Sequence, residues 1–265
     1  MKEAIADTIL YSCSAKQYRG NEQFIAEHSL GYIIAGEMHL FINDKTIVCK
    51  EGSIGLTRKN QLLKSVKFPP PGGEFKSISI YLTQEILRQY VDEHNIAANI
   101  SMDKTPAVQL PANDIFLKGY FQSLTPYFET KEKMSPTLAA LKTKEAVELL
   151  LKIQPSLKNL LFDFNEPHKI DLEAFMNRNF TYNVSMSNFA KLSGRSLAGF
   201  KRDFEKIFNT SPGTWLQQRR LEEAYFLIKK KNKKPSDVYL DVGFENLSHF
   251  SYAFKKAYGM APSMM

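Results

Sequence analysis

The chain has 265 residues, 43% of them hydrophobic, which is enough for two ordinary domains or one large one. Its two cysteines, Cys13 and Cys49, are too few for a disulfide framework or a structural zinc site, and they suit a reducing cytosol. The N-terminus lacks the apolar segment of a signal peptide, and no apolar run reaches about 18 residues, so we expect a cytoplasmic protein with no membrane partner.

The net charge of +7 is distributed unevenly along the chain. Residues 1–165 contain 19 Lys and Arg against 18 Asp and Glu, whereas residues 166–265 contain 16 against 10. The basic excess therefore lies in the last hundred residues, as expected if that part binds a polyanion. Many ordinary domains are equally basic, so charge alone does not establish nucleic-acid binding.

Residues 1–82 alternate short β-branched and aromatic runs with turn residues, a pattern typical of antiparallel sheets. The predicted strands are Thr8–Ser14, Gly31–Ala35, Met38–Ile42, Thr46–Cys49, Ser53–Leu56 and Phe75–Leu82. Many short strands at this spacing predict a small antiparallel barrel or sandwich.

Helical patterns follow from Thr83, which is predicted to cap a helix over Gln84–Glu93. A second helix is predicted over Asn113–Phe128, ending near Pro126, and a third from Ser135-Pro136 to about Ile153. The last two either pair with a second subunit, which we favour, or cover the barrel. We expect a domain boundary near residues 166–169, which separates domain 1–165 from domain 166–265.

The second domain reads as a series of helices that contains an internal repeat. Each copy has a short helix, a glycine turn and a longer helix, which is the helix-turn-helix arrangement. The copies are about fifty positions apart, and a helix from Pro212 to about Lys231 joins them. The shared apolar positions predict a core made by Leu197, Phe200, Phe204, Leu247, Phe250 and Phe254.

The repeat resembles the signature of the AraC/XylS family of transcription regulators. The run from Phe189 to Phe204, followed by Ser211-Pro212, Arg219-Arg220-Leu221 and Ala224, resembles its first half. Val238, Val242-Gly243-Phe244, the run from Ser248 to Lys256, and Gly259 to Pro262 resemble its second half. Two positions depart from the family: Tyr239 replaces a usual Ala, and Tyr252 replaces a frequent Arg.

The resemblance covers residues 168–265 and extends to residues 1–82 only by strand pattern. It implies an α+β chain: an N-terminal cupin-like antiparallel β-barrel with flanking helices, then an all-α domain with two helix-turn-helix units joined by a long helix. It further implies a sequence-specific DNA-binding regulator, an activator like most of the family, which binds double-stranded DNA and RNA polymerase. The first domain would sense a signal or dimerise; whether the effector is a small molecule or a protein, and whether the chain is a homodimer, stays open.

Helix spacing places Ala198, Lys201, Arg202 and Glu205 on outward faces, because Phe200 and Phe204 turn inward. Of these, Ala198, Lys201 and Arg202 match positions that contact DNA in the family that the chain resembles. The candidates for base contacts are Ala198, Lys201 and Arg202 in the first copy, and Ser248, His249, Ser251 and Tyr252 in the second. Arg202 is the best candidate for a bidentate contact to guanine. Arg195, Lys255 and Lys256 are candidates for phosphate contacts. For each of them, a solvated surface residue is the plain alternative.

The competing hypothesis is a cupin-type metal-dependent enzyme or ligand-binding module with a helical appendage. Metal-dependent cupins use a His-x-His pair with Glu and a later His, whereas His28, His39 and His94 are isolated here. Phosphate-loop and nucleophile-elbow motifs do not occur. We therefore expect no enzyme, no catalytic residue, no metal and no cofactor. Arg58, Lys59 and Asn60 are either effector-pocket residues or part of a surface loop.

Overall fold

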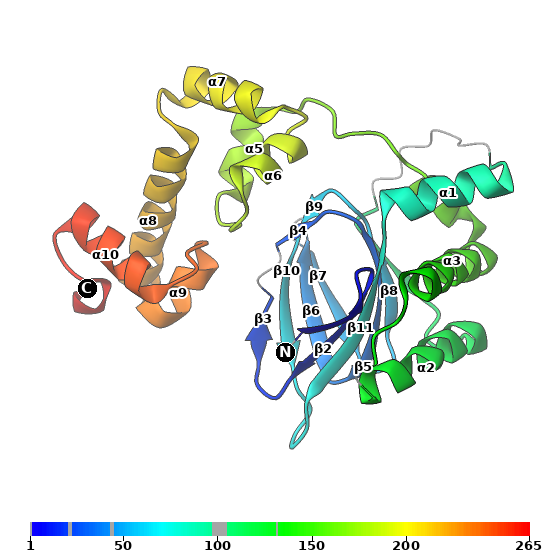
Figure 1. Cartoon of the computed structure of the whole chain (residues 1–265). Coiled ribbons are helices and arrows are strands. Elements are labelled where there is room, and N and C mark those ends of the chain that lie inside the picture. Colours follow the sequence, from blue (N-terminus) through cyan, green and yellow to red (C-terminus); the bar gives the residue numbers. More distant parts are fainter. Residues whose placement is uncertain (1, 21–22, 43–44, 97–104, 131) are drawn as a thin grey trace. The chain divides into compact units, whose positions relative to one another are not determined.

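The computed structural model describes residues 2–20, 23–42, 45–96, 105–130 and 132–265. The chain divides into two compact units, Met1–Asn165, here unit 1, and Glu166–Met265, here unit 2. Among the described residues, every strand lies in unit 1, whereas unit 2 is helical (Figure 1). No described helix is long and apolar enough to cross a membrane.

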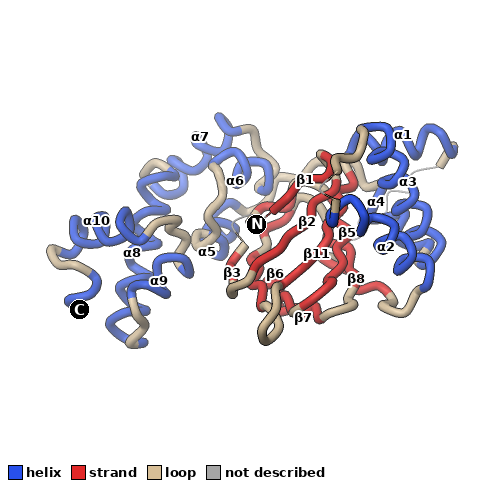
Figure 2. Tube along the Cα trace, turned by 60° about the horizontal axis from the view of Figure 1, so that its bottom comes forward, coloured by secondary structure: helices blue, strands red, loops and turns tan. Residues whose placement is uncertain are grey.

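Unit 1 is built from antiparallel strands. The strands are β1 (Lys2–Ala6), β2 (Ile9–Ser14), β3 (Tyr18–Arg19), β4 (Phe24–Ile25), β5 (His28–Ala35), β6 (Glu37–Ile42), β7 (Lys45–Lys50), β8 (Ile54–Thr57), β9 (Gln61–Leu62), β10 (Lys64–Phe68), β11 (Phe75–Leu82) and β12 (Ala107–Leu110). They form a six-stranded sheet in the order β1-β2-β11-β5-β8-β12, a four-stranded sheet β3-β10-β6-β7 and the pair β4-β9. Figure 2 shows the strands of unit 1 beside its helices α1, α2 and α3. The antiparallel domain is confirmed, although these described ladders do not join into one closed barrel.

The sequence pattern did not predict six of these strands, namely β1, β3, β4, β9, β10 and β12. The strand β10 illustrates why. In β10 the buried side chains are Ser65 and Lys67, while the apolar Val66 and Phe68 are only half-buried. Its alternation is therefore inverted relative to a strand with an apolar inner face. β10 nevertheless pairs with both β3 and β6 and holds the four-stranded sheet together.

Helices cover the outer face of the six-stranded sheet. They are α1 (Gln84–His94), α2 (Ile115–Glu129), α3 (Pro136–Ile153), the 3-10 helix η1 (Pro155–Leu157) and α4 (Lys158–Leu161). Thr83 and Ser135 cap α1 and α3 as predicted. The predicted end of α2 near Pro126 is wrong: α2 continues to Glu129, because a proline so close to the C-terminus disturbs few helical hydrogen bonds.

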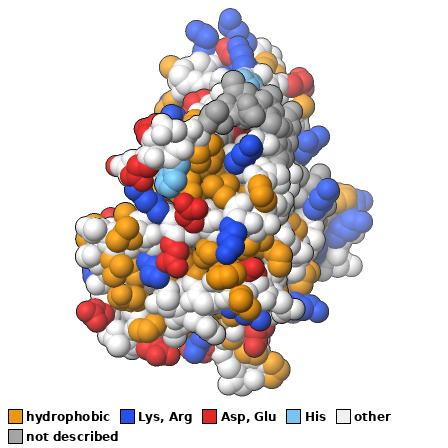
Figure 3. Space-filling view, turned by 90° about the vertical axis from the view of Figure 1, so that its right-hand side faces the viewer, with side chains coloured by type: hydrophobic (Ala, Val, Ile, Leu, Met, Phe, Trp, Pro, Cys, Tyr) orange, Lys and Arg blue, Asp and Glu red, His pale blue; other side chains and the backbone are white. Residues whose placement is uncertain are grey.

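The apolar side chains of α2 and α3 pack mainly against the sheet. Leu117, Phe121 and Leu150 are at most 1% exposed and share one core with strand residues such as Leu30 and Ile80. A smaller group of apolar side chains on α2 and α3 remains in contact with solvent. This exposed group consists of Ile115 (74%), Phe116 (50%) and Leu141 (59%). Figure 3 shows hydrophobic side chains lying among charged ones on one face of the molecule.

Unit 2 consists of helices, among them the two helix-turn-helix units and the long helix that were predicted. They are α5 (Leu172–Asn179), α6 (Met186–Leu192), α7 (Leu197–Phe208), α8 (Pro212–Lys231), α9 (Pro235–Asp241) and α10 (Leu247–Tyr258), followed by the 3-10 helix η2 (Pro262–Met264). Ser185, Ser196, Ser211 and Asn246 each accept a backbone hydrogen bond at a helix start. Gly194 has φ +68°, and a Cβ there would meet the backbone of His168 at 2.2 Å, so this turn requires glycine.

The core predicted from the repeat is correct for the four phenylalanines and wrong for the two leucines. Phe200, Phe204, Phe250 and Phe254 are 0% exposed, whereas Leu197 and Leu247 are 39% and 42% exposed. Both leucines are the first residue of their helix. Helical side chains tilt toward the N-terminus, so a side chain at this position extends beyond the packed stripe.

Candidate nucleic-acid interface

The long helix α8 connects two separate small cores in unit 2. In its first half, Trp215 packs against Phe204 with ring centroids 5.6 Å apart. In its second half, Leu221, Ala224 and Ile228 belong to the core of the second helix-turn-helix unit. Twenty helical residues extend about 30 Å, close to the roughly 34 Å between successive major grooves on one DNA face.

The outward face of α7, the longer helix of the first unit, carries the first group of predicted base contacts. Ala198, Lys201 and Arg202 are all exposed, and the Arg202 side chain is 70% exposed. An Nη2 atom of Arg202 lies 3.5 Å from Asp203, at the limit of a hydrogen bond. The guanidinium is therefore held loosely and faces solvent.

The corresponding face of α10 carries no Lys, Arg, Asp or Glu before its last turn. Ser248, His249 and Tyr252 are exposed, with Tyr252 at 70%, while Ser251 is half-buried and less accessible than predicted. The two predicted phosphate ligands Lys255 and Lys256 are exposed in the last turn. The structure thus places these six residues together on one helix.

Arg195 differs from its predicted phosphate role. Its side chain is only 9% exposed, and Nε lies 3.1 Å from Asp203. Nη1 donates to the carbonyl oxygens of Ile170 and Ser193 at 3.0 and 2.7 Å. The guanidinium therefore links the start of α5 to the turn before α7, and we withdraw it from the phosphate contacts.

Asp203 on α7 forms ion pairs with three cationic side chains, those of Arg195, Lys169 and Arg202. The hydrogen bonds from Arg195 and Lys169, the latter at 3.2 Å, lower the pKa of the Asp203 carboxyl from 3.8 to about 2. The carboxylate fixes Arg195 under α7, so it supports the helix.

We expect Asp203→Asn to destabilise unit 2 at neutral pH and to lose this effect in acid. A depressed folded-state pKa contributes stability that is fully present above the unfolded value of 3.8 and is lost as the pH falls through about 2. Denaturant unfolding of both proteins between pH 7 and pH 2 should show curves that differ above pH 4 and converge below it. A difference that is constant over this range would show that the carboxylate charge is not responsible.

The lysine-rich segment 229–234 lies at the C-terminal end of α8. Lys229, Lys230 and Lys231 form its last turn, where cations favour the negative end of the helix dipole. Lys229 also donates to the Tyr225 hydroxyl at 2.7 Å, and Lys233 lies 3.5 Å from Asp241. These contacts fit a solvated helix end that adds nonspecific attraction to phosphate.

The histidines of unit 1 lie on different elements. His28 on β5 is buried, and burial lowers its pKa to about 3; His39 on β6 pairs with Glu37; His94 ends α1. In the described part of the chain, no group of three or more His, Cys, Asp or Glu is placed to hold a metal ion. Lys59 is 5% exposed and donates to Gln84 at 2.8 Å, so it belongs neither to a surface loop nor to the cavity between the sheets.

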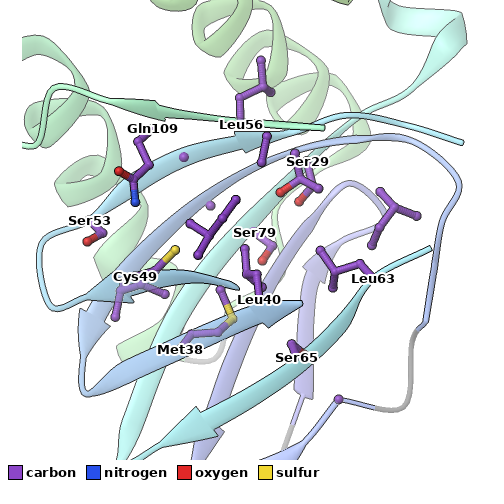
Figure 4. Close-up of a pocket in the computed structure, with 18 of the residues that line it drawn as sticks. Ser29, Met38, Leu40, Cys49, Ser53, Leu56, Leu63, Ser65, Ser79 and Gln109 are labelled. Carbon is purple, nitrogen blue, oxygen red and sulfur yellow. The ribbon is translucent and has the colours of Figure 1, made fainter. Parts of the chain in front are cut away.

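A cavity of about 140 Å³ lies between the six-stranded and four-stranded sheets (Figure 4). One cross-strand row of the six-stranded sheet, Leu10, Ser79, Gly31, Gly55 and Gln109, has small residues at its centre, which leaves this space open. Met38 and Leu40 line it from β6. Serine and glycine at alternate positions of β5, β8 and β11 could have indicated this cavity, because small side chains on one face of a sheet leave space above it. The cavity was not predicted from the sequence.

Lys67 is the one charged side chain among the described residues that line this cavity. It is 8% exposed, its Nζ donates to the Ser12 hydroxyl at 2.8 Å, and it lies 5.3 Å from the centre of the Phe75 ring. The other described residues that line the cavity supply aliphatic, hydroxyl and amide groups, the sulfur atoms of Met38 and Cys49 and the ring of Tyr81. Its chemistry suits a small, mostly apolar molecule with one polar end.

Two protein families match the chain, one on each unit. A family described as the ExsA N-terminal regulatory domain matches residues 28–164, and one described as a helix-turn-helix domain matches residues 189–265. The first match covers more than half of the chain.

Characterised relatives are regulators of transcription. The chain is 23% identical to the HTH-type transcriptional regulator ExsA of Pseudomonas aeruginosa over 252 residues, which cover 93% of this chain and 87% of that protein. It is 30% identical to the virulence regulon transcriptional activator VirF of Yersinia enterocolitica over 122 residues, 44% of this chain and 45% of that one. Among solved structures it is similar to ToxT of Vibrio cholerae, with 14% identity, 97% of each chain covered and a TM-score of 0.45.

Proposed function

This chain belongs to the AraC/XylS family of DNA-binding transcriptional regulators, and from that premise we propose that unit 2 recognises a two-part DNA site through α7 and α10. The observation that carries the proposal is the pair of exposed helix faces at the two ends of α8. Arg202 with Lys201 occupies one face, and His249 with Tyr252 the other. The length of α8 suits two contacts in successive major grooves.

The roles of individual residues divide between the two faces. Arg202 would contact guanine O6 and N7, with Lys201 and Ala198 beside it. On α10, Ser248, His249 and Tyr252 would contact bases, Ser251 less directly, and Lys255 and Lys256 would contact phosphates. We further propose that the bound protein activates transcription by contacting RNA polymerase, as the name of VirF states activation for that relative.

Selection of bound fragments from a random DNA pool by the whole 265-residue chain tests the two-part site. We expect enriched fragments with two preferred blocks whose centres lie about one helical turn, roughly 10 base pairs, apart. A footprint on an enriched fragment should protect one face of the DNA. Enrichment of a single block, or of no sequence, would contradict the proposal.

We propose that the cavity of unit 1 binds a small-molecule effector. Its support is the open row centred on Gly31 and Gly55 and the polar end made by Lys67 and Ser12. A ligand at a hundred times its dissociation constant should stabilise the protein by about 2.7 kcal/mol. Thermal unfolding against a panel of small amphiphiles measures this effect.

Gly31→Leu should abolish such a shift, because the new side chain occupies the cavity while its Cβ meets only ordinary contacts. Gly119→Ala in the exposed part of α2 is the matched control and should retain the shift. A shift that survives Gly31→Leu would place the ligand elsewhere. If the effector is a protein instead, no compound shifts the melting temperature, and a pull-down captures the partner.

We propose that the exposed group Ile115, Phe116 and Leu141 contacts a second copy of the chain. Large apolar side chains in contact with solvent are candidates for an interaction surface, and these three lie on the helices α2 and α3. Leu141→Glu and Phe116→Glu should therefore convert a dimer into a monomer in analytical ultracentrifugation without unfolding it, since both side chains are at least half exposed. Unchanged sedimentation of both variants would exclude this surface.

A further inference from the structure

Arg220 lies in the middle of α8, where the connecting helix passes between the two helix-turn-helix units. Its guanidinium donates from Nε to the carbonyl oxygen of Phe180 at 2.8 Å, from Nη2 to that of Tyr182 at 2.8 Å, and from Nη1 to that of Gly243 at 3.0 Å. Phe180 and Tyr182 lie between α5 and α6 in the first unit, and Gly243 lies in the turn before α10 in the second. One side chain therefore joins three elements through their backbones.

The partner turn is shaped around this contact. Gly243 has φ +94°, and a Cβ there would lie 3.0 Å from Arg220 Nε and 2.7 Å from the carbonyl oxygen of Thr181. Next to it, Asn183 Nδ2 donates to Glu245 Oε1 at 2.8 Å across the same junction. Two separate contacts thus hold the loop between α5 and α6 against the turn between α9 and α10.

The charged guanidinium of Arg220 is largely removed from water, and this desolvation costs free energy. Burial lowers its pKa to about 10, so the group stays protonated at neutral pH with carbonyl oxygens replacing much of its hydration. A hydrophobic side chain would avoid the desolvation penalty, but it would leave these three carbonyl oxygens without the donor that Arg220 supplies. Arginine instead fixes the relative orientation of the carbonyl groups that accept from it, because its hydrogen-bond donors lie in one rigid plane.

We propose that Arg220 is a positioning residue for DNA recognition, which fixes the distance and angle between α7 and α10. The inference rests on the proposed function, since it requires both helices to contact one two-part site. Each helix has its own aromatic core: Phe200 and Phe204 for α7, Phe250 and Phe254 for α10. Loss of the Arg220 junction should therefore leave each helix able to bind its half of the site while the joint binding fails.

The test compares wild type and Arg220→Lys on three kinds of DNA: the selected site, the same site with one half scrambled, and sites with one or two base pairs inserted between the halves. Wild type should prefer the intact site, and the insertions should remove that preference. Arg220→Lys retains the charge but not the fork. It should bind the scrambled site like wild type and lose about tenfold on the intact site, roughly the effect of one hydrogen bond to a charged group.

Two further variants sharpen the comparison. Gln218→Ala is the matched control, because Gln218 is exposed on the same helix and donates to Glu222 within it; it should behave like wild type on all three kinds of DNA. Asn183→Ala weakens the same junction from the surface and should reproduce the loss on the intact site to a smaller extent, even if Arg220→Lys does not fold. Inserted base pairs should matter less to both junction variants than to wild type, which a general loss of stability would not produce.

Equal losses on intact and scrambled sites, or wild-type affinity of the junction variants for the intact site, would overturn the role of Arg220. Failure of the proposed function has a different result: wild type itself would show no preference for an intact over a scrambled site. The two outcomes are distinguished by the wild-type measurement alone.

Discussion

Phe204→Ala is expected to lower the free energy of unfolding of unit 2 by about 3–5 kcal/mol, the usual effect of removing a buried phenyl ring. The ring is 0% exposed and lies between three other aromatic rings, with centroid distances of 5.7 Å to Phe200, 4.3 Å to Phe208 and 5.6 Å to Trp215. The three rigid rings that remain around the cavity leave little opportunity for collapse, because α7 and α8, which carry them, are joined by a short turn. The loss should therefore lie in the upper part of this range.

Trp215 makes the measurement specific to the first helix-turn-helix unit. It is the single tryptophan of the chain, so its fluorescence in urea follows the core that Phe204 belongs to. Phe226→Ala on the same helix α8 is the control: that ring is 45% exposed, and its removal should change stability by no more than about 0.5 kcal/mol. A midpoint for Phe204→Ala equal to that of the control would contradict the assigned core.

The helices of unit 2 could be predicted from the sequence because their signals are local. A serine or asparagine cap, an apolar repeat and a terminating glycine each act within one turn, and Asp171, Ser196, Ser211 and Asn246 each accept a hydrogen bond at a helix start. Arg195 and Arg220 could not be placed in this way. Arg195 donates to the carbonyl oxygen of Ile170, 25 positions away in the sequence, and Arg220 donates to that of Phe180, 40 positions away. A backbone carbonyl group is present in every residue, so the sequence gives no sign of such a partner.

Unit 1 was harder to predict because, around the cavity, polar side chains point inward and apolar side chains of the same strand are more exposed. Ser65 and Lys67 in β10 are buried and would be taken as solvent-facing residues in a strand next to an apolar core. Their inner position becomes meaningful only when the opposite sheet is known to present Ser12 and Ser79 to the same space. The pairing that brings these strands together links residues far apart in sequence, which no local pattern reports.

Arg202→Ala should weaken binding to the selected DNA site by about 1–3 kcal/mol more than binding to random DNA. The Arg202 side chain is 70% exposed, and Asp203, the acid nearest to it, is held more closely by Arg195 and Lys169 at 3.1 and 3.2 Å than by Arg202 at 3.5 Å. The guanidinium can therefore leave Asp203 at small cost and donate two parallel hydrogen bonds to guanine. Wild type and variant would be compared on both DNAs by gel shift at several salt concentrations.

Lys230→Ala is the control for charge without base recognition, because Lys230 is exposed in the last turn of α8. If this turn meets DNA, its loss should lower affinity for both DNAs equally and flatten the dependence on salt. Tyr252→Ala on α10 should change specificity with little change in that dependence, since a neutral aromatic ring recognises shape and apolar contact. An equal loss on selected and random DNA for Arg202→Ala would remove Arg202 from the base contacts and leave α7 as a phosphate-binding helix.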